Sequence, residues 1–95
     1  MSQSKKEIQV QESIQQLAGQ FLAREASPQS LITVTRAHVD SALKYCTIYI
    51  SVMPVTAEKG ALDFCKRSRS DFRDFMKKKS ALHFPPLIDF ELDYG

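Results

Sequence analysis

Hydrophobic residues recur along the chain with two different periods, and these periods predict its secondary structure. Ser4 followed by Glu7 has the spacing of a capping box, which typically begins a helix. Behind it, the apolar residues between Val10 and Phe21 repeat every three or four positions and so share one helical face. We therefore expect a first helix that ends at about Arg24.

Three short segments instead alternate between apolar and polar residues, as strands do. Residues 46–52 and 88–92 alternate strictly. In residues 31–39 the alternation changes parity near Thr35 and Arg36. One extra residue there, a β-bulge, would return the apolar side chains of this strand to a single face, namely Ile32, Val34, Ala37 and Val39.

A second helical pattern runs from Ala57 to about Lys79, with Thr56 as the expected N-cap. Its apolar face is interrupted at Ser68-Arg69-Ser70, and Ser68 with Asp71 has the spacing of a second capping box. One interpretation is a break at this point followed by a new helix. The other is a continuous helix whose serines face solvent.

The order of these elements predicts an α+β fold in a single domain covering residues 1–95. The first two strands should form an antiparallel hairpin, and the helical crossover should bring the third strand in parallel. We expect the helices to cover one face of the resulting three-stranded sheet.

Two cysteines, Cys46 and Cys65, are too few for a disulfide framework and both lie in apolar patterns. We expect buried, reduced thiols, with a single bridge as the alternative. The first residues lack the apolar run of a signal peptide, and no segment approaches the roughly 20 apolar residues of a membrane span. These features predict a cytoplasmic protein without a membrane partner.

The net charge of +2 conceals an uneven distribution. Residues 66–79, called the basic segment below, contain seven basic and two acidic residues, whereas the rest of the chain contains six basic and nine acidic. A helix beginning near Ser68 would also offer amide groups to a phosphate. The segment favours nucleic-acid binding, with an ordinary solvated helix face as the alternative.

The paired strand sequences, Ile32-Thr33-Val34-Thr35 and Ile48-Tyr49-Ile50-Ser51-Val52, resemble those of the ribosome-binding factor A family. That family shows Ile-Thr-Ile-Thr followed by a strand ending in Val-Tyr-Val-Ser-Val. Further matches follow over about residues 8–93, at Phe72, Arg73, Pro86, Ile88, Phe90 and Asp93.

The resemblance implies a type II KH-like fold, α-β-β-α-(kink)-α-β, and a role in 30S subunit maturation and rRNA processing. The partners would be the small ribosomal subunit and its 16S-type RNA, bound by a chain that is monomeric when free. The family has Ala-x-Gly at the kink, whereas this chain has Ser68-Arg69-Ser70. The expected RNA-binding residues are Lys66, Arg67, Ser68, Arg69, Ser70, Arg73, Lys77, Lys78 and Lys79.

The sequence does not predict an enzyme, a cofactor, a metal site or a small-molecule substrate. His38 and His83 lack partners at triad or metal-ligand spacing, and we expect His38 on a strand surface. Asp89, Glu91 and Asp93 share a strand face that could bind a cation, although solvation is the simpler interpretation. The alternative functions are a protein–protein adaptor, anchored by exposed Tyr45 and Tyr49, and a ribosome-independent KH-type RNA-binding module. The latter would need a Gly-x-x-Gly loop, which the sequence lacks.

Overall fold

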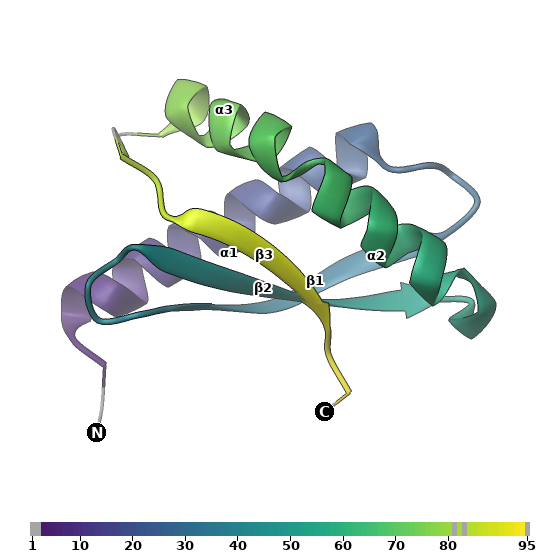
Figure 1. The fold of residues 1–95 in the computed structure, drawn as a ribbon, viewed down its shortest axis with the longest axis horizontal. Helices are drawn as coiled ribbons and strands as arrows, with labels where there is room; N and C mark the ends of the chain where they lie inside the picture. The colour runs from purple at the N-terminus through teal and green to yellow at the C-terminus, as the bar shows by residue number, and fades with distance from the viewer. Residues whose placement is uncertain (1–2, 81, 83, 95) are drawn as a thin grey trace.

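The computed structural model describes residues 3–80, 82 and 84–94, and within them helices pack on one face of a sheet (Figure 1). The observed order is α-β-β-α-α-β, which confirms the predicted α+β fold. The elements are α1 (Lys5–Glu25), β1 (Leu31–Val39), β2 (Tyr45–Met53), a short 3₁₀ helix (Val55–Ala57), α2 (Glu58–Arg67), α3 (Arg69–Lys79) and β3 (Leu87–Leu92).

Helix α1 begins where the capping pattern predicts. The Glu7 amide donates a hydrogen bond of 3.1 Å to Ser4 Oγ. The Ser4 hydroxyl in turn donates to the Glu7 carboxylate, so the two side chains also bond directly. The helix buries most of the predicted apolar face, namely Ile14, Leu17, Ala18 and Phe21, together with Leu22, whereas Val10 is half-buried.

The strand order is β1-β2-β3, with β1 antiparallel and β3 parallel to the central strand β2. Val34 pairs with Ile50 and Arg36 with Tyr49, so Thr35 is the extra residue of a bulge. The Thr35 hydroxyl donates to the Tyr49 carbonyl oxygen at 3.2 Å. The predicted bulge is thereby confirmed, and it keeps the apolar residues of β1 on the helix side.

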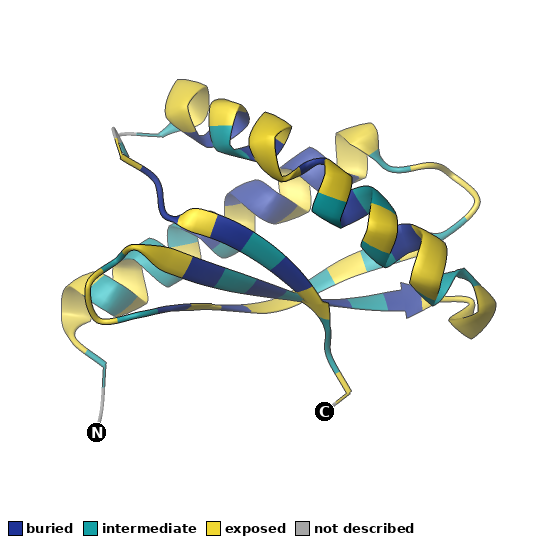
Figure 2. Cartoon of the chain, viewed as in Figure 1, coloured by how far each residue is buried: buried dark blue, intermediate teal, exposed yellow. Residues whose placement is uncertain are grey.

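The core lies between the sheet and the helices, where the buried positions of these two layers meet (Figure 2). Phe21 of α1 packs on Phe72 and Phe75 of α3, with ring centroids 5.3 and 5.5 Å apart. Phe90 of β3 lies 6.2 Å from Phe72 and joins this cluster to the sheet. Tilted pairs at these distances add to the stabilisation from buried area.

Both cysteines belong to this core. Cys46 of β2 and Cys65 of α2 are buried and free, which confirms their prediction as reduced, buried thiols. Burial raises the pKa of Cys46 to about 12 and the pKa of Cys65 to about 11. Neither thiol is therefore a nucleophile at neutral pH.

The long helical pattern is divided at Ser68, which confirms the predicted break. The Ser68 amide donates to the carbonyl oxygens of both Phe64 and Cys65, and its backbone leaves helical geometry at φ −92° and ψ 6°. The predicted capping role is wrong, however. The Ser68 hydroxyl donates backwards to the Phe64 carbonyl oxygen at 2.8 Å instead of accepting from α3. Such back-bonding bends helices.

The expected N-cap of the second helix is also displaced. Thr56 lies inside the 3₁₀ helix, and α2 begins only at Glu58. Ala57 occupies the N-cap position without a side-chain hydrogen bond. The proline at position 54 fixes where β2 ends, and the 3₁₀ turn then redirects the chain before α2 starts.

Candidate nucleic-acid interface

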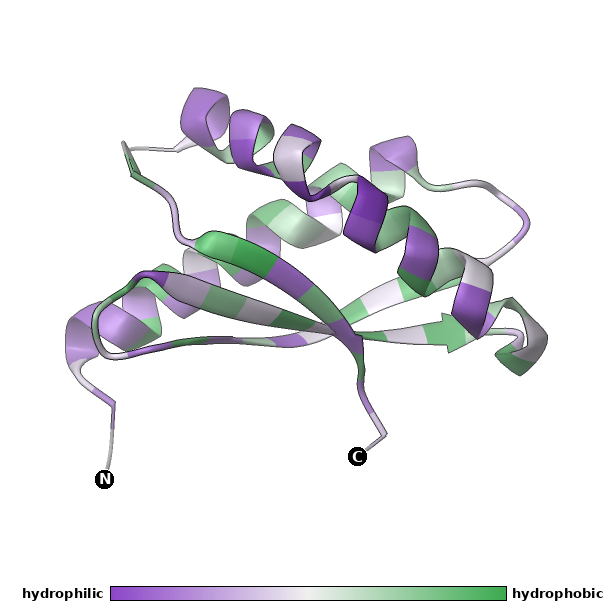
Figure 3. Ribbon diagram, viewed as in Figure 1, coloured by the Kyte–Doolittle hydropathy of each residue, from purple (hydrophilic) through white to green (hydrophobic). Residues whose placement is uncertain are grey.

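The basic segment spans the end of α2 and all of α3, and the fold divides its charges between two faces. Lys66, Arg69, Arg73 and Lys77 follow one another at spacings of three, four and four, so they form a stripe beside β3, called the β3-side cations below. Asp71, Asp74 and Lys78 lie on the other face, toward α1. Figure 3 shows hydrophilic residues along the outer side of α2 and α3.

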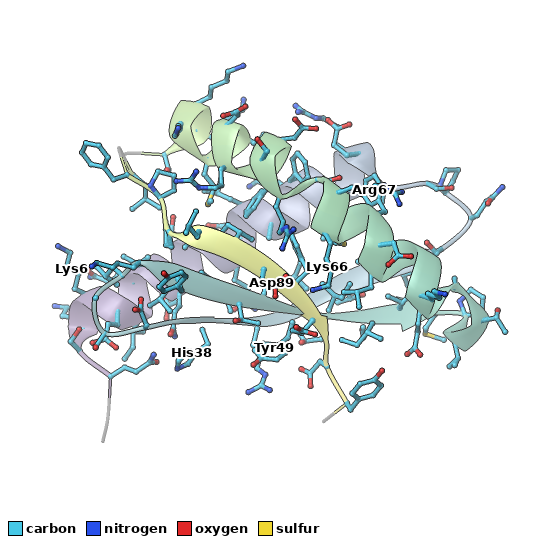
Figure 4. The ribbon with its side chains drawn as sticks, viewed as in Figure 1. Lys6, His38, Tyr49, Lys66, Arg67 and Asp89 are labelled. Atoms are coloured by element: carbon cyan, nitrogen blue, oxygen red, sulfur yellow. The ribbon has the colours of Figure 1, made fainter. Side chains whose placement is uncertain are left out.

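Two of the β3-side cations converge on one carboxylate. Lys66 Nζ lies 2.9 Å and Arg69 Nη1 3.3 Å from Asp89 Oδ1, and Lys66 Nζ lies 3.8 Å from Glu91 Oε1 (Figure 4). Arg69 Nε also donates to the Lys66 carbonyl oxygen at 2.9 Å. The two side chains remain 34% and 48% exposed, so donor groups of both are open to solvent.

The Asp89 carboxylate also accepts a hydrogen bond of 2.9 Å from the Phe90 amide in its own strand. Partial burial raises the pKa of Asp89, but the bonds from Lys66 and Phe90 and the nearby charge of Arg69 lower it more. The net pKa lies below the ordinary value, so Asp89 is ionised at neutral pH. Charged groups placed in this way also protect an edge strand from pairing with another chain.

Arg73 has a structural contact of its own. Its Nε donates to the Pro86 carbonyl oxygen at 3.2 Å, and its Nη2 donates to that of Pro85 at 3.0 Å. Arg73 is half-buried, and both prolines are buried. This side chain therefore holds the connection that leads from α3 into β3, in addition to carrying positive charge.

The α1-facing side of the segment carries more acidic than basic side chains. A cleft of about 330 Å³ lies between α1 and the α2–α3 junction, and its floor is formed by aromatic rings such as Phe21 and Phe75. Asp71 and Asp74 line it together with Lys78, and Arg24 of α1 lies 5.2 Å over the Phe75 ring. Because acidic side chains line this cleft together with the basic ones, the cleft does not form an anion-binding site.

The remaining predicted residues differ in accessibility. Lys77, Lys79 and Ser70 are exposed, and the two lysines form no ion pair with the described residues. Arg67 is exposed but points away from Asp89, beside the loop that follows α1 (Figure 4). Ser68 is buried, and its hydroxyl donates to the Phe64 carbonyl oxygen within the helix.

The carboxylates of β3 are ion-paired rather than simply solvated, which sequence reasoning did not foresee. Beyond Asp89 and Glu91, Asp93 accepts a hydrogen bond of 2.6 Å from the Thr35 hydroxyl and lies 3.6 Å from Arg36 Nε. Among the described residues, no group of three or more His, Cys, Asp and Glu side chains is arranged to hold a metal ion. In the sequence, the alternation of acidic residues along β3 was the signal that could have predicted these ion pairs.

The two histidines and two tyrosines complete the sequence-based candidates. His38 is exposed on β1, as predicted, whereas His83 lies outside the described residues. Tyr45 is exposed, but Tyr49 is half-buried because the Arg36 guanidinium lies 4.1 Å over its ring. No helix in the described part of the chain has the length and apolar content needed to cross a bilayer.

The fold and this basic surface define the class of protein: an α+β domain of the type II KH-like kind. The family model of ribosome-binding factor A matches residues 4–95. The chain therefore belongs to the ribosome-binding factor A family, as its strand and helix motifs predicted. This is a family of non-catalytic factors, in agreement with the prediction that the chain is not an enzyme.

Individual ribosome-binding factor A proteins are also similar to this chain. Ribosome-binding factor A of Fervidobacterium nodosum is 28% identical over 68 residues, which are 70% of this chain and 54% of that protein. The chain thus matches about half the length of this curated relative. The solution NMR structure of a Thermotoga maritima protein assigned to ribosome-binding factor A aligns with a TM-score of 0.80 and 25% identity, over 100% of this chain and 93% of that one.

A third comparison concerns a protein placed on the ribosome. The Thermus thermophilus ribosome-binding factor A, as fitted into a cryo-EM map of its complex with the 30S subunit, aligns with a TM-score of 0.71 and 18% identity. The alignment covers 95% of this chain and 93% of that one. At this identity the likeness concerns the fold.

Proposed function

We propose that this chain is a maturation factor of the small ribosomal subunit and that it binds 16S-type ribosomal RNA through the β3-side cations. The observation that carries the proposal is the stripe of Lys66, Arg69, Arg73 and Lys77 along one side of α2 and α3. Family membership and the 30S complex of the Thermus thermophilus relative support the choice of partner.

Intramolecular pairing does not remove this stripe as an RNA surface. Asp89 uses part of the donor capacity of Lys66 and Arg69, while an arginine carries five N–H groups and a lysine three. Lys77 lies one helical turn beyond Arg73 and extends the stripe with a fully available charge.

The proposal is tested by co-sedimentation of the purified protein with small and large ribosomal subunits over a series of salt concentrations. We expect preferential binding to small subunits and a steep loss of affinity as salt increases, because each phosphate contact releases counterions. Lys77→Ala should weaken binding and reduce the log–log salt slope by about 0.7 to 0.9. Lys77 is the most suitable position because it is exposed and forms no ion pair with the described residues.

Lys59→Ala is the matched control. Lys59 is also an exposed helical lysine, but it lies in the first turn of α2, outside the basic segment. It should bind like the wild type with an unchanged slope. Equal binding to both subunits, or a Lys77→Ala slope equal to that of Lys59→Ala, would refute the assigned surface. Binding to small subunits that is insensitive to salt would favour a protein–protein adaptor instead.

A further inference from the structure

An apolar hollow of about 510 Å³ lies at the end of the sheet where β2 and β3 both begin. Tyr45 and Leu87 are register partners at the first positions of these strands, and Phe84 from the α3–β3 connection lines the same hollow. The three side chains are 60%, 54% and 94% exposed. In Figure 3 the first part of β3 is coloured as hydrophobic. Clustered exposure of this kind marks a binding surface.

One wall of the hollow is the β1–β2 turn, which is held by its own hydrogen bonds. The Asp40 carboxylate accepts from the amides of Lys44 and Tyr45, at 2.7 and 3.0 Å. Leu43 takes the left-handed conformation that the turn requires, with φ 57°. The Leu87 amide then donates to the Lys44 carbonyl oxygen at 2.8 Å and ties β3 to this turn.

The other wall is the segment of Pro85 and Pro86, both of which line the hollow. Their carbonyl oxygens are the two acceptors of the Arg73 guanidinium described above. Because both walls are fixed by hydrogen bonds, the hollow exists before any ligand arrives. A planar ligand could then bind without much ordering of the protein.

The hollow carries a positive charge, because Lys44 is the charged residue among the described residues that line it. The nearby Asp40 carboxylate belongs to the β1–β2 turn and accepts hydrogen bonds from backbone amides there. Exposed aromatic rings next to cations are what proteins use to stack unpaired bases while they bind the neighbouring phosphates.

We propose that Tyr45 and Phe84 stack on unpaired bases of ribosomal RNA, while Lys44 contacts an adjacent phosphate. This inference rests on the proposed function and adds the class of RNA that is recognised. The RNA at this end of the molecule is single-stranded, because bases inside a duplex do not expose their faces for stacking.

A single-stranded RNA hexamer that carries one 2-aminopurine tests the stacking directly, because stacking on an aromatic ring quenches the fluorescence of this base. The wild type should quench the probe, and an RNA hairpin of equal charge should compete poorly. Phe84→Ala and Tyr45→Ala should each bind about tenfold more weakly and lose quenching, with an unchanged salt slope. Phe84→Tyr should retain both.

Tyr94→Ala is the matched control, since Tyr94 is an aromatic side chain that is 83% exposed and does not line the hollow. If Phe84→Ala and Tyr45→Ala behave like Tyr94→Ala, the stacking inference is wrong, even where salt-dependent binding to small subunits leaves the proposed function intact. If the two variants lose affinity for intact small subunits but not for the hexamer, the hollow contacts a protein instead. That result would also overturn the inference.

Discussion

The Lys66 ammonium group and the Asp89 carboxylate are 2.9 Å apart and join the last turn of α2 to the outer edge of β3. The same carboxylate accepts from Arg69 and from the Phe90 amide. One acidic side chain thus fixes two cations of the proposed RNA surface and binds one backbone amide of β3.

Replacement of Asp89 by asparagine should lower the free energy of unfolding by about 1 kcal/mol, because a partly exposed ion pair and a backbone hydrogen bond are weakened. The same change should strengthen binding to small subunits at low salt, since it frees Lys66 and Arg69 from their anion. Urea unfolding and co-sedimentation measure the two effects. Asp63→Asn, on the exposed side of α2, should change neither. Weaker RNA binding by Asp89→Asn would show that the pairing is needed to orient the cations.

The stability that Asp89 contributes should depend on pH. Its folded pKa lies below the ordinary value of 3.8. A carboxylate with a depressed folded pKa contributes fully above its unfolded pKa and loses that contribution as the pH falls through the folded one. The difference in unfolding free energy between the wild type and Asp89→Asn should therefore be constant from about pH 7 to pH 5 and shrink below about pH 4. A difference that grows in acid would contradict this.

Arg73 should contribute more to stability than the exposed cations of the basic segment. Arg73→Ala removes two charge-assisted hydrogen bonds to the buried Pro85 and Pro86 carbonyls, at a cost of about 2 kcal/mol. Lys77→Ala on the next turn should stay within about 0.5 kcal/mol of the wild type. Thermal or urea unfolding distinguishes the two. Equal stability of both variants would mean that the α3–β3 connection is held by packing alone.

The break between α2 and α3 can be tested at its serines. Ser68→Ala should lower the unfolding free energy by about 1 kcal/mol, because Ser68 is buried and its hydroxyl bonds to the Phe64 carbonyl oxygen. Ser70→Ala, two residues away and exposed, should have almost no effect. If the two alanine variants are equally stable, the hydroxyl of Ser68 does not contribute to the junction.

Both thiols should resist modification in the folded protein. Burial raises the pKa of Cys46 and Cys65 to about 12 and about 11, so at pH 8 neither forms a reactive thiolate. A thiol reagent such as an aromatic disulfide should label neither native cysteine on mixing and should label both after denaturation. Rapid labelling of one thiol in the native protein would show that its helix or strand opens locally.

The sequence by itself determined the elements of this protein, because hydrophobic periodicity is a local property. The alternation around Thr35 located the bulge, whereas the serines at 68 and 70 left a helix break and a continuous helix both open until the family kink favoured the break. The order of the elements predicted the α+β class, and the family motifs added the KH-like type of fold. At Ser68 the capping pattern located the helix end but not the hydrogen bond. The Ser68 hydroxyl can bond either to the amides of α3 or to the Phe64 carbonyl oxygen, and in the folded protein it bonds to the carbonyl.

The tertiary structure alone decided which charges of the basic segment are paired or available. Lys66 and Asp89 are 23 residues apart and meet only because the crossover places β3 beside α2. The same crossover brings Arg73 to the Pro85 and Pro86 carbonyls and places Tyr45 in one hollow with Phe84. Electrostatic and stacking contacts act through space over a few ångströms, so their partners follow from the packing of elements and not from spacing along the chain.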